Sequence, residues 1–243
     1  MSQTTKYDIF ISYSRQDMET VDMICNHLDA NNISYFRDIF DISISSTFTQ
    51  TLADAILSCR LVLFIASKNS FASNYTSKEV TFAYQNHIAI MPLLVDNTPM
   101  PTHFQFMFSD VQCMRLAESS TTRLISEIKD ILAYLKLIDN PQDAVAVKRI
   151  INIPKRGIGA TTLSRVESYA QAGGLSFFDA LMDCERIPGL GKAINKINEF
   201  VNFIRVQRSK LGYNSLQEIL ESIMKDTGYI EELKNENTDE SLA

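Results

Sequence analysis

The feature of this sequence that most constrains its fold is the apolar run Leu61-Val62-Leu63-Phe64-Ile65-Ala66, which no polar residue interrupts. A strand with one wet face alternates apolar and polar residues, so an unbroken run is typical of a strand that is covered on both faces. Such strands belong mostly to parallel sheets with helices on each side. The surrounding sequence must therefore supply further strands and the helices that connect them.

The first 136 residues supply both in alternation. Apolar runs predict three more strands, at Tyr7–Tyr13, Ile33–Phe36 and Ile88–Val95. Apolar residues at helical spacing predict four helices, at Asp17–Asn31, Phe48–Ser58, Asn74–Asn86 and Thr121–Leu135. Helices between consecutive strands imply right-handed crossovers and a parallel sheet. We therefore expect an α/β fold of the flavodoxin-like kind, with its site outside the carboxyl ends of the strands.

The strand signals stop after Asn140-Pro141, and only helical patterns follow. Proline and glycine residues separate five predicted helices, at Ala144–Ile151, Thr161–Ala172, Ser176–Met182, Gly191–Lys210 and Ser215–Asp226. We predict two domains, an α/β domain at residues 1–136 and a smaller all-α region at residues 137–243. The polar segment Lys234–Ala243 is expected to fray.

The charge is acidic overall but unevenly placed. The formal net charge is −6, which argues against strong nonspecific binding of nucleic acid by the whole molecule. Residues 140–215 hold eleven Lys and Arg against six Asp and Glu, whereas the residues from 216 onward hold two against eight. The helical region is therefore mildly basic, with an acidic end.

Composition also excludes several other classes. The four cysteines are scattered and the three histidines do not lie at metal-ligand spacing, so we expect neither a disulfide framework nor a metal site. No apolar run approaches the roughly 18 residues that a membrane span requires, and the amino terminus lacks the order of a signal peptide. We expect a cytoplasmic protein without membrane contact.

Four motifs of the first half resemble, in order, those of TIR (Toll/interleukin-1 receptor) domains. They are Phe10-Ile11-Ser12-Tyr13-Ser14 with Asp17, then Phe36-Arg37-Asp38, then Leu63-Phe64-Ile65-Ala66-Ser67, and last Tyr75-Thr76-Ser77-Lys78-Glu79, which is similar to the family's W-x-x-x-E segment. The resemblance covers about Lys6 to Lys136. It implies a flavodoxin-like parallel sheet of five strands.

TIR domains fall into two functional classes, adaptors that assemble signalling complexes and enzymes that cleave NAD+ at the nicotinamide–ribose bond. In the enzymes NAD+ is a substrate and no cofactor is needed. The resemblance implies that Glu79 is the catalytic glutamate. Bond cleavage leaves a ribose oxocarbenium ion, which a fixed carboxylate stabilises. The alternative for Glu79 is an acidic residue that merely complements a helix dipole.

The resemblance also implies a set of substrate-binding residues. Arg15 is expected to hold a phosphate of NAD+, with Ser14 in the same turn, although a solvated surface arginine is an equal alternative. Phe36 corresponds to an aromatic position on the nicotinamide side of the cleft, but a core phenylalanine explains it equally well. Tyr75 lies one helical turn before Glu79 and is expected to pack its ring beside the nucleotide.

The sequence departs from the family pattern at two places. Tyr75 replaces the usual tryptophan, and the loop from Asp38 to Thr47 lacks the glycine that is common there. Neither change removes the carboxylate. Because no G-x-G-x-x-G motif follows the first strand, a dehydrogenase that uses NAD+ as a recycled cofactor is disfavoured.

The second half resembles another family. The run from Arg149 to Gly159, Arg-Ile-Ile-Asn-Ile-Pro-Lys-Arg-Gly-Ile-Gly, is similar to the start of the 2B subdomain of UvrD-type DNA helicases. The chain contains no G-x-x-x-x-G-K-S/T loop to hold nucleotide phosphates, so we expect no helicase activity from it. What the resemblance leaves is a set of possible duplex contacts: Lys155, Arg156, Gly157, Gly159, Thr161 and Thr162.

For these candidate DNA-contact residues we favour another interpretation, a glycine turn between packed helices with weak or no binding of nucleic acid.

The leading interpretation of the whole chain is an NAD+ hydrolase that releases ADP-ribose or a cyclic isomer, self-associates through its TIR domain, and serves bacterial defence or signalling. A noncatalytic TIR module acting by TIR–TIR contact is the alternative. A DNA-binding protein is a third interpretation and requires affinity that falls steeply with salt.

Overall fold

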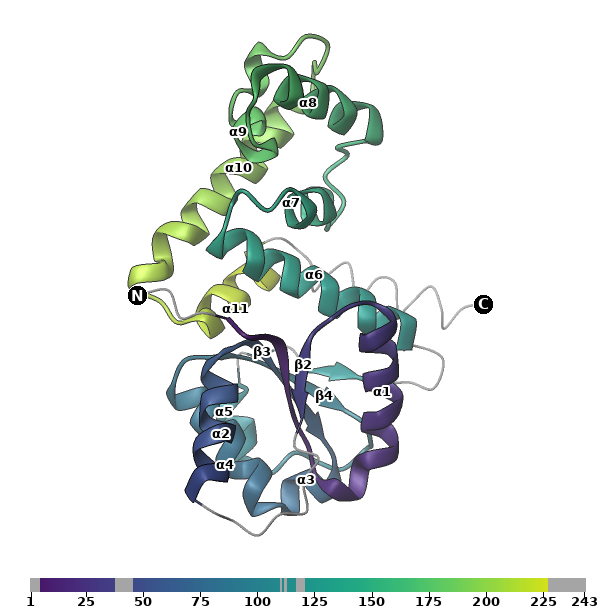
Figure 1. Cartoon of the computed structure of the whole chain (residues 1–243), viewed down its shortest axis with the longest axis vertical. Helices are drawn as coiled ribbons and strands as arrows, with labels where there is room; N and C mark the ends of the chain where they lie inside the picture. Colours follow the sequence, from purple (N-terminus) through teal and green to yellow (C-terminus); the bar gives the residue numbers. More distant parts are fainter. Residues whose placement is uncertain (1–4, 38–45, 110, 112, 117–120, 227–243) are drawn as a thin grey trace. The chain divides into compact units, whose positions relative to one another are not determined.

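A computed structural model of the chain describes residues 5–37, 46–109, 111, 113–116 and 121–226 (Figure 1). The chain divides into two compact units. The first runs to Ile128 and includes Ser215–Gln217, and the second holds the remaining residues from Lys129 onward. Helix α6 (Thr121–Asp139) crosses the predicted domain boundary without a break. The boundary between residues 136 and 137 thus stays a prediction.

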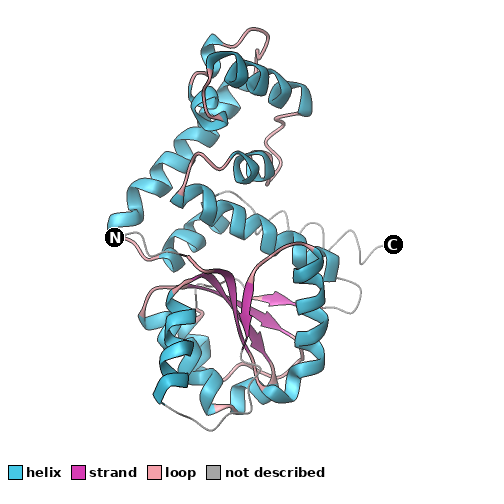
Figure 2. Ribbon diagram, in the orientation of Figure 1, coloured by secondary structure: helices cyan, strands magenta, loops and turns pink. Residues whose placement is uncertain are grey.

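The first unit is built on a five-stranded parallel sheet, as predicted (Figure 2). Its strands are β1 (Tyr7–Ser12), β2 (Tyr35–Arg37), β3 (Cys59–Ala66), β4 (Ala89–Leu94) and β5 (Met114–Arg115). Their spatial order is β2-β1-β3-β4-β5, which is the flavodoxin-like order. The sequence analysis located the first four strands to within a few residues and did not locate the two-residue β5.

Helices cover both faces of this sheet. Besides residues 121–128 of α6, the first unit holds the short turn η1 (Arg15–Asp17) and the helices α1 (Met18–Ala30), α2 (Ser46–Leu57), α3 (Lys68–Ala72), α4 (Asn74–Gln85) and α5 (Thr102–Met107). Figure 1 shows α1 on one side of the sheet and α2 and α4 on the other. Helices α3 and α5 escaped prediction because five or six residues are too few to show helical periodicity.

The alternation of side chains along β1 and β3 decides what each face of the sheet meets. On one face, Phe10, Val62 and Phe64 join a buried cluster with Val80 and Ala83 of α4. Successive strand residues point to opposite faces, so Ser12 lies on the same face as Phe10, at the carboxyl end of the strand. This periodicity brings a serine, rather than an apolar residue, to the end of the face that α4 covers.

Within the described residues, the second unit contains helices and no strand, as predicted. It holds α7 (Ala144–Ile150), α8 (Ala160–Gly173), α9 (Phe177–Met182), α10 (Ala193–Ser209), the turns η2 (Cys184–Arg186) and η3 (Lys210–Gly212), and most of α11 (Leu216–Asp226). Its buried core draws on α7, α8, α9 and α10, with Val147, Val166, Leu181 and Phe200 among its members. The predicted frayed segment Lys234–Ala243 lies outside the described residues. Within the described ranges, no helix is both long and apolar enough to cross a membrane.

Candidate functional site

The predicted catalytic glutamate lies at the carboxyl edge of the sheet. Thr76, Glu79, Val80 and Ala83 recur at helical spacing, so they share the side of α4 that faces the sheet. Helix α4 begins near this edge, and Glu79 is in its second turn, half-buried. The Ser12 hydroxyl donates a hydrogen bond of 2.7 Å to Glu79 Oε2. The two residues are 67 positions apart in the sequence, so only the fold brings them together.

A second carboxylate holds the turn that follows β1. Asp17 accepts hydrogen bonds from Ser67 Oγ at 2.5 Å and from Asn69 Nδ2 at 2.7 Å, with a longer one of 3.4 Å from Ser70 Oγ. The Ser14 backbone N–H in turn donates to Ser70 Oγ at 3.0 Å. These bonds tie the turn η1 to the start of α3, at the carboxyl ends of the neighbouring strands β1 and β3.

The predicted substrate-binding residues of this edge differ in exposure. Arg15 is exposed on η1, between the anchored residues Ser14 and Asp17. Ser14 is nearly buried, and its hydroxyl accepts from the Gln16 backbone N–H as the cap of η1. The Tyr75 side chain is half exposed, with the Lys78 ammonium 5.9 Å from its ring centre. The side chains of Arg15 and Tyr75 are thus accessible to solvent, whereas the Ser14 hydroxyl caps the turn η1.

Phe36 packs within the sheet layer. Its ring stacks on Phe10 at 5.6 Å between centres and meets Tyr7 edge-on at 5.5 Å. These contacts are those of a core residue, the alternative that the sequence analysis held equal. The ring is only partly buried, so its assignment to the nicotinamide side of a cleft stays a prediction.

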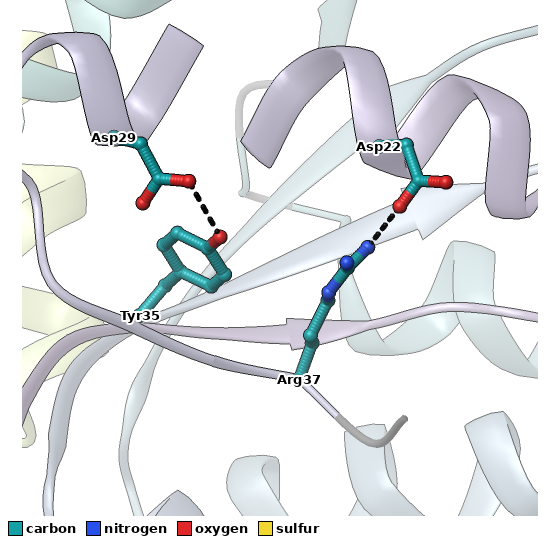
Figure 3. Close-up of polar contacts among 4 residues, drawn as sticks. All are labelled: Asp22, Asp29, Tyr35 and Arg37. Carbon is teal, nitrogen blue, oxygen red and sulfur yellow. Dashed lines mark hydrogen bonds and ion pairs between the residues drawn. The ribbon is translucent and has the colours of Figure 1, made fainter. Parts of the chain in front are cut away.

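Two polar contacts fasten the edge strand β2 to α1 (Figure 3). The Tyr35 hydroxyl donates to Asp29 Oδ2 at 3.1 Å, and Arg37 pairs with Asp22. Burial, together with hydrogen bonds to Cys25 and Asp29, raises the pKa of Tyr35, so its hydroxyl stays protonated. Of the predicted loop from Asp38 to Thr47, residues 38–45 lie outside the described part of the chain, and the last two residues begin α2. The prediction about the missing glycine stays untested.

A third carboxylate lies after the carboxyl end of β4. Asp96 accepts the backbone N–H of Lys68 at 2.8 Å and that of Thr98 at 2.8 Å. Burial acts to raise the pKa of Asp96, but these hydrogen bonds outweigh it and leave the pKa below its ordinary value. Asp96 therefore anchors the start of α3 from the side of β4.

Sequence reasoning assigned no role to several residues of this edge. Asp17, Ser67 and Ser70 form the anchor of η1, and Thr76 carries a buried hydroxyl with no hydrogen-bond partner within the described ranges. Asp17 and Ser67 did belong to the quoted motifs. Ser67 directly follows a predicted strand and Asp17 lies four residues after another, and this position was the signal that could have marked them as edge residues.

In the second unit, the residues proposed for DNA contact are largely engaged in the turn itself. Asn152 Oδ1 accepts the backbone N–H groups of Arg156 at 2.9 Å and of Ile158 at 3.1 Å. The Arg156 guanidinium points inward, donating to backbone carbonyls and to the Tyr134 hydroxyl at 3.0 Å. Its role as a phosphate contact therefore gains no support from its geometry.

The other members of that set lie around the start of α8. Lys155 and Thr161 are exposed, and Thr162 is half-buried, with its backbone N–H donating to the Gly159 carbonyl at 3.0 Å. Gly157 adopts a φ of +70°, which favours glycine. An open groove of about 420 Å³ runs along α8 beside this turn, lined by Thr161, Ser164, Arg165, Ser168, Tyr169, Ile187 and Pro188. DNA contact by these residues stays a prediction.

Comparison with known proteins places a family on each part of the chain. Residues 9–128 match the family model described as TIR domain. Residues 9–128 are a TIR domain. Residues 124–185 match the model described as UvrD-like helicase C-terminal domain. Both matches agree with the resemblances of the sequence motifs. Within the described ranges, no group of three or more His, Cys, Asp or Glu residues could hold a metal ion.

Curated relatives match the helicase-like part. The ATP-dependent DNA helicase PcrA of Bacillus subtilis is 44% identical over 115 residues, which are 47% of this chain and 16% of the helicase. The helicase UvrD1 of Mycobacterium leprae is 38% identical over 120 residues, which are 48% of this chain and 15% of the helicase. The chain thus spans about a sixth of the length of these relatives.

Solved structures of TIR proteins match the chain at low identity. The TIR domain of the Toll-related receptor TRR-2 from Hydra magnipapillata is 19% identical, with a TM-score of 0.43, over 51% of this chain and 99% of that one. A metazoan TIR-STING receptor from C. gigas is 17% identical, with a TM-score of 0.41, over 70% of this chain and 53% of that one.

Proposed function

We propose that the TIR domain cleaves NAD+ at the nicotinamide–ribose bond, with Glu79 as the catalytic carboxylate. The observation that carries the proposal is the position of Glu79, half-buried at the carboxyl edge of the sheet and hydrogen-bonded to Ser12. Ligands of flavodoxin-like folds bind outside this edge. A glutamate whose only role is to complement the helix dipole would lie in the first turn of the helix and would need no hydrogen bond to a strand. Glu79 lies in the second turn and has such a bond.

The proposed reaction requires few catalytic groups besides the Glu79 carboxylate. When the bond between ribose C1′ and the pyridine nitrogen breaks, its electron pair goes to nicotinamide, which leaves neutral and needs no general acid. Positive charge then spreads over C1′ and the ring oxygen of the ribose, and the negative Glu79 carboxylate stabilises this oxocarbenium ion. Water adds to C1′ and releases a proton, giving ADP-ribose. Attack by another group of the same nucleotide would give a cyclic isomer.

The remaining residues of the edge fit binding roles. Arg15 is exposed on an anchored turn, which suits a guanidinium that meets the diphosphate of NAD+. Tyr75 exposes half of its side chain one turn before Glu79 and offers a ring for stacking. Self-association of TIR domains, a cytoplasmic location and a role in bacterial defence or signalling belong to the same proposal. The helical unit would then act as a sensor, partner surface or oligomerisation element.

The test is nicotinamide release from NAD+ by the purified chain, followed by chromatography. We expect Glu79→Gln, which keeps the shape and removes the charge, to lower the rate by on the order of 100- to 1000-fold. Glu19→Gln on the exposed side of α1 is the matched control and should leave the rate unchanged. Because self-association is part of the proposal, specific activity should rise with protein concentration.

Two results would contradict the proposal. A parent chain that releases no nicotinamide at any concentration favours the noncatalytic alternative, in which the TIR domain acts by contact with other TIR domains. A Glu79→Gln variant as fast as its parent would remove Glu79 from the chemistry even if NAD+ is cleaved.

A further inference from the structure

We propose that Ser12 is a positioning residue that fixes the catalytic carboxylate of Glu79, an inference that rests on the proposed cleavage of NAD+. The family motif contains this serine, but the sequence analysis gave it no role beyond its strand. The Ser12 hydroxyl donates to Glu79 Oε2 at 2.7 Å, which is the length of a strong hydrogen bond between a hydroxyl and a carboxylate.

The position of Ser12 suits this role. It is fully buried at the end of β1, a strand with neighbours on both sides, β2 and β3. Ser12 is registered against Phe64 of β3, so its backbone is held by the ladder. A buried hydroxyl needs a hydrogen-bond partner. The partner here is the Glu79 side chain, so this hydrogen bond links helix α4 to strand β1 of the sheet.

The bond acts on the flexible part of the site. A glutamate side chain turns about three bonds, and a half-buried one samples several rotamers unless something holds it. Holding Oε2 on a rigid strand fixes where the carboxylate lies relative to the edge. A neutral hydroxyl does this without contributing an opposing charge of its own. Since misplacement of a reacting group by about 1 Å can cost on the order of 100-fold in rate, the bond matters for catalysis.

The variants separate positioning from folding. Ser12→Ala removes the hydroxyl and little volume, and Ser12→Thr keeps the hydroxyl. Ser34→Ala is the matched control, because Ser34 Oγ donates to Asp8 Oδ2 at 3.0 Å beside the opposite end of β1. The rate constant kcat and the KM for NAD+ are measured at one protein concentration, together with melting temperatures of Ser12→Ala, Glu79→Ala and the double variant.

We expect Ser12→Ala to lower kcat by about 10- to 100-fold with KM within about twofold of the parent, since binding groups lie elsewhere. Ser12→Thr should recover most of kcat, and Ser34→Ala should keep all of it. The double variant should lower the melting temperature by less than the sum of the two single variants, because each single variant already breaks the same hydrogen bond.

Three results would overturn the inference. If the parent cleaves NAD+ and Ser12→Ala matches its kcat, the positioning role fails while the proposed function stands. Additive losses of melting temperature would show that the two side chains do not interact. A parent that releases no nicotinamide would remove the proposed function and this inference together.

Discussion

Arg156 should stabilise the helical unit rather than bind DNA. Its Nη1 lies 3.0 Å from the Ile150 carbonyl oxygen and 2.9 Å from that of Ile153, with two longer contacts of 3.3 Å to Ile151 and Pro154. Its Nη2 donates to the Tyr134 hydroxyl at 3.0 Å. The guanidinium also lies 5.4 Å from the centre of the Phe200 ring.

These distances set the size of the effect. One nitrogen has two hydrogens, so the four carbonyl contacts amount to about two hydrogen bonds, and Nη2 adds a third. Bonds to a charged group contribute about 1.5–3 kcal/mol each, and the partial exposure of Arg156 reduces the sum. We expect Arg156→Ala to destabilise the second unit by roughly 3 kcal/mol, or about 100-fold in its opening equilibrium.

Hydrogen exchange followed by mass spectrometry on the whole chain measures this locally. Amides of α7 and α10 should exchange about 100-fold faster in Arg156→Ala, while those of β1 and β3 should be unaffected. Arg156→Lys should lose part of the protection, because one ammonium cannot serve both the carbonyls and Tyr134. Arg205→Ala, an exposed arginine of α10, is the control and should exchange like the parent.

The opposite pattern would refute this reasoning. If Arg156 contacts phosphate, Arg156→Ala would leave exchange unchanged, weaken DNA affinity and lower the slope of affinity against salt by about one.

Two further predictions concern stability, one in the second unit and one in the first. Gly174 ends α8 with a φ of +63°, so Gly174→Ala should cost about 1–2 kcal/mol in a denaturation experiment, whereas Gly173→Ala, which meets only ordinary contacts, should cost nothing. Equal losses for both glycines would contradict this. Asp96 has a lowered pKa because of its bonds to Lys68 and Thr98, so it stabilises the fold above its unfolded pKa of about 3.8, and this contribution is lost as pH falls further. Asp96→Asn should therefore flatten the loss of melting temperature below pH 4, and an unchanged acid profile would contradict the assignment.

The strands of the first unit were predictable because their signal is local. The run from Leu61 to Ala66 forms most of β3, and each other predicted strand was right to within a few residues. Strand β5 was not located because two residues carry no periodicity. Its pairing is decided by the neighbouring strand β4, through partners such as Leu93 and Met114.

The candidate site was predictable only in part, for a related reason. A motif can single out Glu79, but the bond to Ser12 depends on how α4 packs against β1, across 67 positions of sequence. In the same way, Lys155 and Arg156 look alike as neighbouring cations in the sequence. Only the packed turn shows that one is exposed and that the other caps the carbonyls beneath it.

The proposal assigns different roles to Asp17 and Glu79, two carboxylates at the carboxyl edge of the sheet. Asp17 receives hydrogen bonds from three side chains of one short segment, so its oxygens hold the turn that carries Arg15. Glu79 accepts the Ser12 hydroxyl at Oε2 and stays half-buried. A carboxylate that satisfies several donors stabilises a fold, whereas a partly exposed one held at a fixed point can still meet a developing positive charge. Our proposal therefore gives the chemistry to the half-buried Glu79 and the anchoring of η1 to Asp17.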